Sequence, residues 1–281
     1  MRLFAVWTRR STPAYAPISC PDTDRYDSIM PARLTIFFAF AFSALVASLG
    51  LVPPASAGVV IDGTRVVYLG QKREVTLNVH NNGAAPSLVQ AWLDAGNPQA
   101  KPGEDKVPFL LIPPLFRLDP TKGQSLRLFY TQEPLPADRE SLFWLNVLDI
   151  PPRESANPDM PNKLEFAFKH RIKLFFRPDK LPGTAADAPA QLTWKLVTRK
   201  GKATLEVSNP TPYHVSFSQV TVIAGGASIS AKADMVSPFA SRTLDLSKPE
   251  VEPAGPLQVD YSFINDYGGI TKGTFNAPAT H

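Results

Sequence analysis

Short β-rich segments, some of them with alternating apolar and polar positions, dominate the chain after residue 57. In the first group, each segment stops at asparagine, glycine or proline residues, which are typical of turns. This group comprises Val75–His80, Leu88–Leu93, Ser125–Thr131 and Ser141–Ile150. A period of two places successive side chains on opposite faces of a strand, and no segment keeps the period of 3.6 with the caps that a helix needs. The pattern therefore predicts antiparallel sheets.

A second group of such segments follows later in the chain. It comprises Leu192–Thr198, Ala203–Ser208, Val215–Ile223, Ala227–Ala231, Ser241–Leu246 and Leu257–Ile264. Pro178 and Leu181-Pro182-Gly183 end the first group, and the Ala- and Pro-rich Thr184–Ala190 begins the second. The length of 281 residues suits two domains, and 29 prolines argue against a helical bundle. We expect an all-β protein with two sandwich domains, residues 58–179 and 182–281.

The first 57 residues have the features of a secretory signal. The uncharged apolar run 34–51 follows Arg33, and Ala55-Ser56-Ala57 offers small residues for a signal peptidase. The alternative is a transmembrane anchor, because the run is close to the length that spans a bilayer. We expect cleavage near Ala57 and export to the periplasm. Met30 is a second possible start of translation.

Lys163–Arg177 differs from the other segments because it is long and contains neither glycine nor proline. Its first half alternates strictly, so that Leu164, Phe166 and Phe168 share one face. A strand edge this long and apolar would normally favour aggregation, so its presence suggests a partner. The alternative is that these side chains belong to the core of the first domain.

The residues that carry common catalytic chemistry are sparse. The chain has four histidines, none at metal-ligand spacing, and its only cysteine, Cys20, precedes the expected cleavage point. There is no Gly-x-Ser-x-Gly elbow and no phosphate-binding glycine loop. The net charge of +4 is too small to indicate nucleic-acid binding. We therefore expect no enzyme, no metal, no cofactor and no small-molecule substrate.

Four motifs, in this order and spacing, resemble one known family. They are Thr64-Arg65-Val66-Val67-Tyr68, Glu140–Asn146 leading into Ile150-Pro151-Pro152, Arg171–Pro178, and Ile264-Asn265-Asp266-Tyr267-Gly268-Gly269. The chain is similar to the periplasmic chaperones of the chaperone–usher pathway. The resemblance implies two immunoglobulin-like domains in a boomerang arrangement. It also implies that the protein binds pilin (fimbrial) subunits by lending them a β-strand, and that it delivers them to an outer-membrane usher.

The resemblance also assigns site residues. Arg65 and Lys173 match the pair of cations that hold the carboxylate at the subunit's C-terminus, and Leu164, Phe166 and Phe168 match the side chains that fill the subunit's groove. Lys173 is expected to lie on the same face as these three residues. A further set matches a charged cluster between the domains that fixes their angle. Its members are Glu140, Arg177 and Asp266.

Two alternatives from other classes remain open. The first is an exported adhesin or carbohydrate-binding module with two immunoglobulin-like domains, in which Arg65 and Lys173 have no special role. The second is an enzyme on a β-sandwich, for example a metal-dependent one. Bound metal after purification would indicate the enzyme, and binding that survives loss of the two cations would indicate the adhesin.

Overall fold

The computed structural model describes residues 58–152, 166–199, 202–224, 226–248 and 256–277. The chain divides into two units, Met1–Ala55 and Ser56–His281, and all described residues belong to the second. The expected signal segment and Leu164 lie outside the described residues. Within the described ranges, no helix has the length and apolar character needed to cross a membrane.

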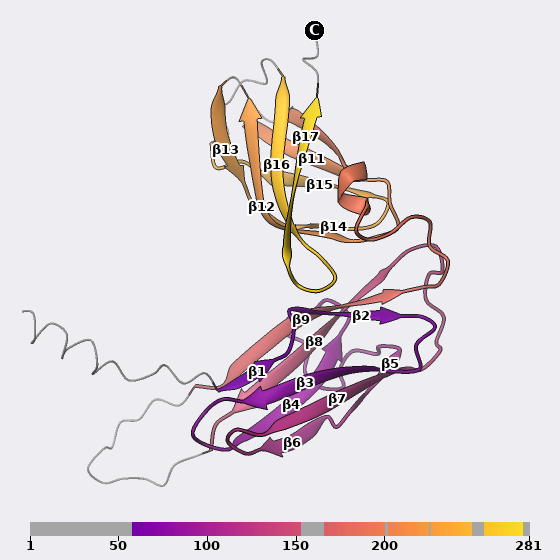
Figure 1. Ribbon diagram of the computed structural model, residues 1–281, viewed down its shortest axis with the longest axis vertical. Coiled ribbons are helices and arrows are strands. Elements are labelled where there is room, and N and C mark those ends of the chain that lie inside the picture. Colours follow the sequence, from indigo (N-terminus) through magenta and orange to yellow (C-terminus); the bar gives the residue numbers. More distant parts are fainter. Residues whose placement is uncertain (1–57, 153–165, 200–201, 225, 249–255, 278–281) are drawn as a thin grey trace, which may run out of the picture. The chain divides into compact units, whose positions relative to one another are not determined.

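In the described part of the first sandwich there are nine strands (Figure 1). They are β1 (Val59–Ile61), β2 (Arg65–Leu69), β3 (Val75–Asn81), β4 (Ser87–Asp94), β5 (Phe109–Ile112), β6 (Leu115–Leu118), β7 (Gly123–Tyr130), β8 (Ser141–Ile150) and β9 (Phe168–Arg177). One sheet has the order β1-β3-β7-β5 and the other β2-β9-β8-β4-β6. The inward side chains of both sheets form one core, in which Tyr68, Leu126, Leu145 and Leu174 are fully buried. All strand pairs are antiparallel except β2 and β9, which run parallel.

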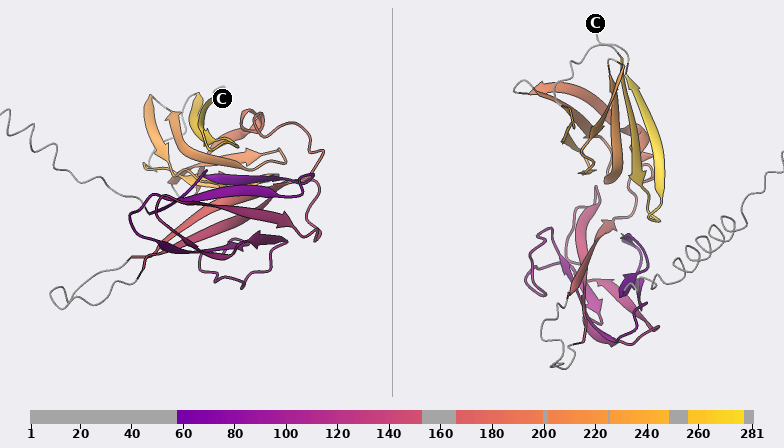
Figure 2. Two further views of the ribbon diagram at one scale, coloured as in Figure 1. Left: turned by 60° about the horizontal axis from the view of Figure 1, so that its bottom comes forward. Right: turned by 90° about the vertical axis from the view of Figure 1, so that its left-hand side faces the viewer.

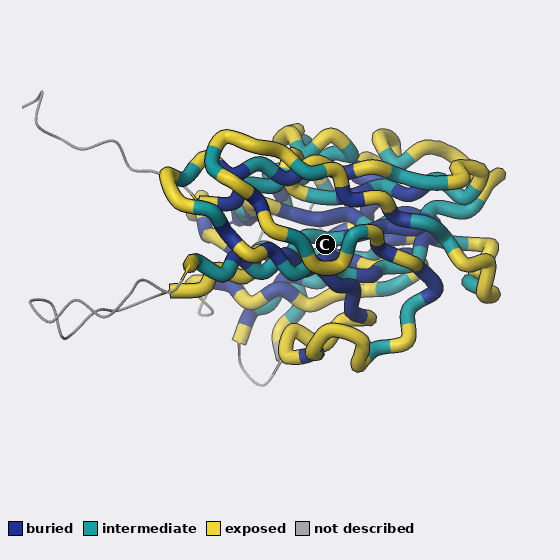
Figure 3. The backbone as a smooth tube through the Cα atoms, turned by 90° about the horizontal axis from the view of Figure 1, so that it is seen from below, coloured by how far each residue is buried: buried dark blue, intermediate teal, exposed yellow. Residues whose placement is uncertain are grey.

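The remaining elements form the second sandwich (Figure 2). A 3₁₀ helix, η1 (Ala188–Gln191), precedes β10 (Thr193–Arg199), β11 (Lys202–Asn209), β12 (Val215–Ala224), β13 (Ala227–Ala231), β14 (Met235–Val236), β15 (Ala240–Asp245), β16 (Leu257–Ile264) and β17 (Ile270–Ala277). One sheet has the order β10-β11-β15, and the other has the order β13-β12-β16-β17 with β14 paired to β12. A separate core of buried residues, centred on Trp194, Leu205 and Val259, holds the two sheets together. Figure 3 shows how the buried stretches run through the strands while the turns are exposed.

The predicted all-β class with two sandwiches is confirmed. β8, β13 and β16 have the predicted bounds, and Gly268-Gly269 lies in the turn of the β16–β17 hairpin. β5 and β6 were not predicted, because Phe109–Phe116 is a nearly continuous apolar run interrupted by two prolines, without clear alternation. β9 is described from Phe168 onward, so the first residues of the predicted long strand lie outside the description.

Candidate functional site

The two predicted anchor cations are neighbours in the structure. β2 and β9 pair in parallel with Arg65 in register with Lys173. The Arg65 Nη1 donates to the Ile264 carbonyl at 2.7 Å, and the Lys173 Nζ donates to the Ser216 hydroxyl at 3.0 Å. Both side chains are half-buried. Among the described residues, neither cation forms an ion pair with a carboxylate.

The electrostatics of this pair favour an anion. Burial and the nearby charge of Arg65 lower the pKa of Lys173, and Asp234 opposes the shift only in part. Burial likewise lowers the pKa of Arg65, against the attraction of Asp266 and Glu140. The Arg65 Nε is buried without a hydrogen-bond partner in the described structure. Two adjacent, partly desolvated cations are each stabilised by a carboxylate placed between them.

β9 has an open edge that leads directly to this pair. β8 pairs with β9 from Phe168 to Phe176, whereas β2 covers the other edge only from Lys173 to Arg177. No described strand pairs with the stretch Phe168–Ile172 on that edge. The unpaired backbone groups of an edge strand can accept another chain. This unpaired stretch lies on the same edge of β9 as β2. It ends at Ile172, just before Lys173, which pairs with Arg65, the first residue of β2.

Two phenylalanines are exposed where β9 begins, Phe166 just before the strand and Phe168 as its first residue. Phe166 is 59% exposed and Phe168 is 60% exposed, and their ring centroids lie 6.4 Å apart. By the period of two, Phe168 shares a face with Leu174 and Phe176, which are buried in the core. The core-facing side of β9 therefore continues past the end of the core into solvent. This exposure argues against the alternative that Phe166 and Phe168 are core residues.

The expectation that Lys173 lies on the face of Phe168 is wrong. The two residues are five apart in one regular strand, and an odd separation places them on opposite faces. Lys173 is on the face of Lys169 and Arg171, and its Nζ lies 5.7 Å from the centroid of the Trp144 ring. The apolar face and the cationic anchor are thus separate surfaces of β9, joined by the open edge.

A buried ion pair that the sequence did not reveal holds the cationic face of β9. Arg171 binds Asp94 with both arms, Nη2 to Oδ1 at 2.6 Å and Nε to Oδ2 at 3.1 Å, while the guanidinium lies 4.0 Å from the centroid of the Trp144 ring. Asn146 and the backbone N–H of Gly96 also donate to Asp94. Burial alone would raise the pKa of Asp94, but these hydrogen bonds outweigh it and lower the pKa. The network fixes β9 against β8 and β4.

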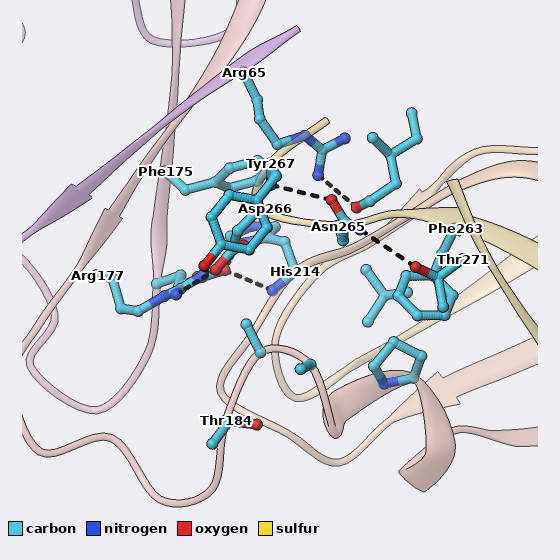
Figure 4. Close-up of a pocket in the computed structure, with 16 residues that line it drawn as sticks. Arg65, Phe175, Arg177, Thr184, His214, Phe263, Asn265, Asp266, Tyr267 and Thr271 are labelled. Atoms are coloured by element: carbon cyan, nitrogen blue, oxygen red, sulfur yellow. Dashed lines mark hydrogen bonds and ion pairs between the residues drawn. The ribbon is translucent and has the colours of Figure 1, made fainter. Parts of the chain in front are cut away.

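The predicted charged cluster is assembled around Arg177, at the end of β9 (Figure 4). Its Nε donates to Glu140 at 2.8 Å, and its Nη1 and Nη2 donate to the two oxygens of Asp266 at 2.7 and 3.0 Å. The backbone N–H of His214 donates to the other Glu140 oxygen at 2.7 Å, a contact that sequence analysis missed. Burial alone would lower the pKa of Arg177, but its hydrogen bonds to Asp266 and Glu140 and their negative charges outweigh this effect and raise the pKa.

The cluster lines a cavity of about 340 Å³ together with Arg65, Phe175 and the β16–β17 hairpin. Figure 4 shows Arg177 and Asp266 pointing toward each other, and Arg65 reaching the backbone beside Asn265. The described residues contain no group of His, Cys, Asp or Glu arranged to hold a metal ion. Around β9, the described residues thus combine an open strand edge, an exposed apolar face and a pair of half-buried cations.

Comparison with known families agrees with this geometry. The model of the pili and flagellar-assembly chaperone, PapD N-terminal domain, matches residues 58–182. The model of the pili assembly chaperone PapD, C-terminal domain, matches residues 187–275. The chain belongs to the pili assembly chaperone family. The family predicted from the four motifs is thus confirmed, and this is a family of chaperones, not of enzymes or adhesins.

Relatives of this pili assembly chaperone cover most of the chain. Chaperone protein FimB/FhaD of Bordetella pertussis is 45% identical over 82% of this chain and 91% of its own. The probable fimbrial chaperone YadV of Escherichia coli is 42% identical over 77% of this chain and 89% of its own. The solved YadV structure aligns with a TM-score of 0.68 over 79% of this chain and all of its own.

A further solved structure contains a bound partner. The chain aligns with a TM-score of 0.64 and 32% identity to the structure of the Salmonella enterica SafA pilin in complex with the SafB chaperone. This alignment covers 79% of the pili assembly chaperone described here and 96% of the matched chain.

Proposed function

We propose that this chaperone binds pilin subunits by adding the open edge of β9 to the subunit's sheet and by holding the subunit's C-terminal carboxylate between Arg65 and Lys173. The observation that carries the proposal is the position of the anchor. The unpaired stretch Phe168–Ile172 ends at the register pair of Arg65 and Lys173. A strand that pairs with this edge would therefore end beside β2, next to the half-buried cations Arg65 and Lys173.

The position of β2 also sets the direction of the bound strand. Because β2 already occupies the edge from Lys173 onward, an incoming strand must stop there. The C-terminus of the bound strand would lie at Lys173, and its preceding residues would lie along Phe168–Ile172. Such a strand runs parallel to β9. The subunit's terminal carboxylate would fix the register of its strand against β9. A shift of one residue would turn every side chain of that strand to the opposite face. Charge-assisted hydrogen bonds of this kind contribute about 1.5–3 kcal/mol each.

The apolar side of β9 supplies the rest of the affinity. Phe166 and Phe168 are exposed in the free protein and lie on the core-facing side of β9, beyond the end of the core. Inserted into a groove of an incomplete sandwich, each ring would contribute about 1.5–3 kcal/mol. Leu164 extends the same alternation by sequence and is included in the proposal as the third such residue.

The proposal extends to the route of the protein and of its cargo. Segment 1–57 is removed near Ala57, the mature chaperone acts in the periplasm, and it passes its subunits to an outer-membrane usher. The domains are residues 58–179 and 182–281. The cluster of Glu140, Arg177 and Asp266 binds the β16–β17 hairpin to the end of β9, which keeps Ile264 within reach of Arg65.

Co-purification tests the proposal. A pilin from the same gene cluster, expressed with the chaperone, should be recovered in a one-to-one complex, and a pilin that lacks its C-terminal strand should not. A complex of equal yield with the truncated pilin would refute the proposed mode of binding.

A further inference from the structure

Asp149 of β8 is a buried carboxylate with an incomplete set of partners. The residue is only 5% exposed. Its Oδ2 accepts a hydrogen bond from the backbone N–H of Val59 at 3.1 Å. Its Oδ1 is buried and has no hydrogen-bond partner among the described residues. A buried carboxylate oxygen without a donor is costly, so this position calls for a further cation or donor.

The nearest basic side chains do not supply that partner. His170 and Arg171 line the same cavity as Asp149. The guanidinium of Arg171 is committed to Asp94 by two hydrogen bonds, at 2.6 and 3.1 Å. His170 is exposed, and neither residue forms an ion pair with Asp149 in the described structure. The missing partner must therefore come from another group that reaches this cavity.

The backbone of Gly58 lies against this carboxylate. A Cβ atom placed on Gly58 would be 2.6 Å from the Asp149 Oδ2, so the glycine Cα is in close contact with the carboxylate. Gly58 is held there by the hydrogen bond from the Asn82 N–H to its carbonyl at 3.1 Å and by the pairing of Val59 with Asn81 in β3. The nitrogen of Gly58 is one bond from that Cα and is therefore within reach of the carboxylate.

We propose that Asp149 is the binding site for the α-ammonium group of Gly58 in the processed chain. The inference rests on the proposed export and on cleavage after Ala57. Hydrolysis of the Ala57–Gly58 peptide bond adds one water, leaves the carboxylate on Ala57 and frees the amine of Gly58, which takes up a proton. A neutral amide with one N–H thus becomes a cation with three N–H donors beside Asp149.

This ion pair links processing to the subunit-binding edge. Asp149 is in register with Phe168, the first residue of β9, and Val59 and Phe168 line the same cavity. An ammonium group held by Asp149 ties β1 to the start of the open edge. Removal of the leader therefore stabilises the region where the bound strand begins, and the unprocessed precursor lacks this stabilisation.

Three matched backgrounds test the inference: wild type, Asp149→Asn, and the control Asp62→Asn, an exposed carboxylate in the loop after β1. Each is prepared beginning at Gly58 and again with Ser56-Ala57 retained. In wild type and in Asp62→Asn, the retained residues should lower Tm by about 3–8 °C. In Asp149→Asn, both forms should have the same Tm. The inference is overturned if the retained residues lower Tm equally in Asp149→Asn, or if they do not lower Tm in wild type.

A second measurement does not depend on how well the Asp149 variant folds. The α-amino group of the wild-type protein beginning at Gly58, titrated by NMR, should have a pKa above the ordinary range of about 7.7–8.0. An ordinary value overturns the inference, as does a periplasmic protein whose N-terminus is not Gly58. Pilin capture by the same preparations tests the proposed function separately, because capture that fails while Tm still depends on Asp149 refutes only that function.

Discussion

Arg65 and Lys173 lie side by side in register across the parallel strands β2 and β9, two cations without a carboxylate partner among the described residues. Like charges at this distance repel, and partial burial adds to the cost. The pKa of Lys173 is accordingly lowered, first by burial and then by Arg65. An anion placed between the two cations would offset this cost, as the proposed site for the subunit's carboxylate requires.

The exposed apolar side chains Phe166 and Phe168 should be needed for pilin capture. Phe166→Asp and Phe168→Asp place a charge in the proposed groove and should reduce the yield of complex at least tenfold, because an unpaired buried charge costs more than the lost apolar burial. Both variants should stay folded, since these rings are exposed. Leu110→Asp, an equally exposed apolar position on β5, is the control and should leave capture unchanged. Equal losses for all three variants would contradict the assignment.

Pilin binding should weaken at alkaline pH. A bound carboxylate stabilises protonated Lys173, so affinity is full below the free-state pKa of Lys173 and is lost as the pH rises through it. That pKa is lowered from the usual 10.5 by burial and by Arg65. Kd measured from pH 7 to 10 should rise in wild type but stay flat in Lys173→Arg, whose guanidinium remains charged. Parallel curves for the two proteins would show that another group titrates.

The Asp94–Arg171 pair should stabilise the first sandwich in a pH-dependent way. The pKa of Asp94 is lowered in the folded state, so its contribution is present above the ordinary value of 3.8 and is lost as the pH falls below it. Asp94→Asn should lower the free energy of unfolding by about 3–5 kcal/mol at pH 7, because Arg171 loses its buried partner. The variant should also show a flatter decline of stability between pH 5 and 3. If urea titrations gave the same decline in the free energy of unfolding below pH 5 for Asp94→Asn and wild type, Asp94 would be ruled out as the source of that decline.

Loss of Arg177 should be costly even though the residue does not contact the proposed subunit site. Its side chain is 16% exposed and neutralises Glu140, whose side chain is 2% exposed. Arg177→Met should destabilise the protein by about 3–5 kcal/mol in chemical denaturation. Adding Glu140→Gln should recover part of the loss, since the uncompensated charge is then gone. A double variant as unstable as Arg177→Met alone would mean that packing against Tyr213, not charge, explains the cost.

Strands were predictable where the local pattern is strong: β16 alternates clearly, and β8 is a β-rich run that ends at two prolines. The pairing of Asp94 with Arg171 was not predictable, because it joins positions 77 residues apart without a local signal. The role of Arg65 came only from family resemblance, since its register with Lys173 depends on a parallel pairing that spacing does not reveal. The opposite faces of Lys173 and Phe168 follow from the sequence alone, because an odd separation within one strand excludes a shared face.

In the proposed complex, Arg65 and Lys173 bind the C-terminal carboxylate of the pilin at the end of the open edge of β9. This binding is tested most directly with a peptide of the pilin's C-terminal strand, prepared as the free acid and as the amide, and titrated against wild type, Lys173→Met, Arg65→Met and the control Lys169→Met. Amidation should weaken binding at least tenfold in wild type and in the control, and by less than threefold in the other two variants. Equal affinity of acid and amide for the wild-type protein would contradict the account.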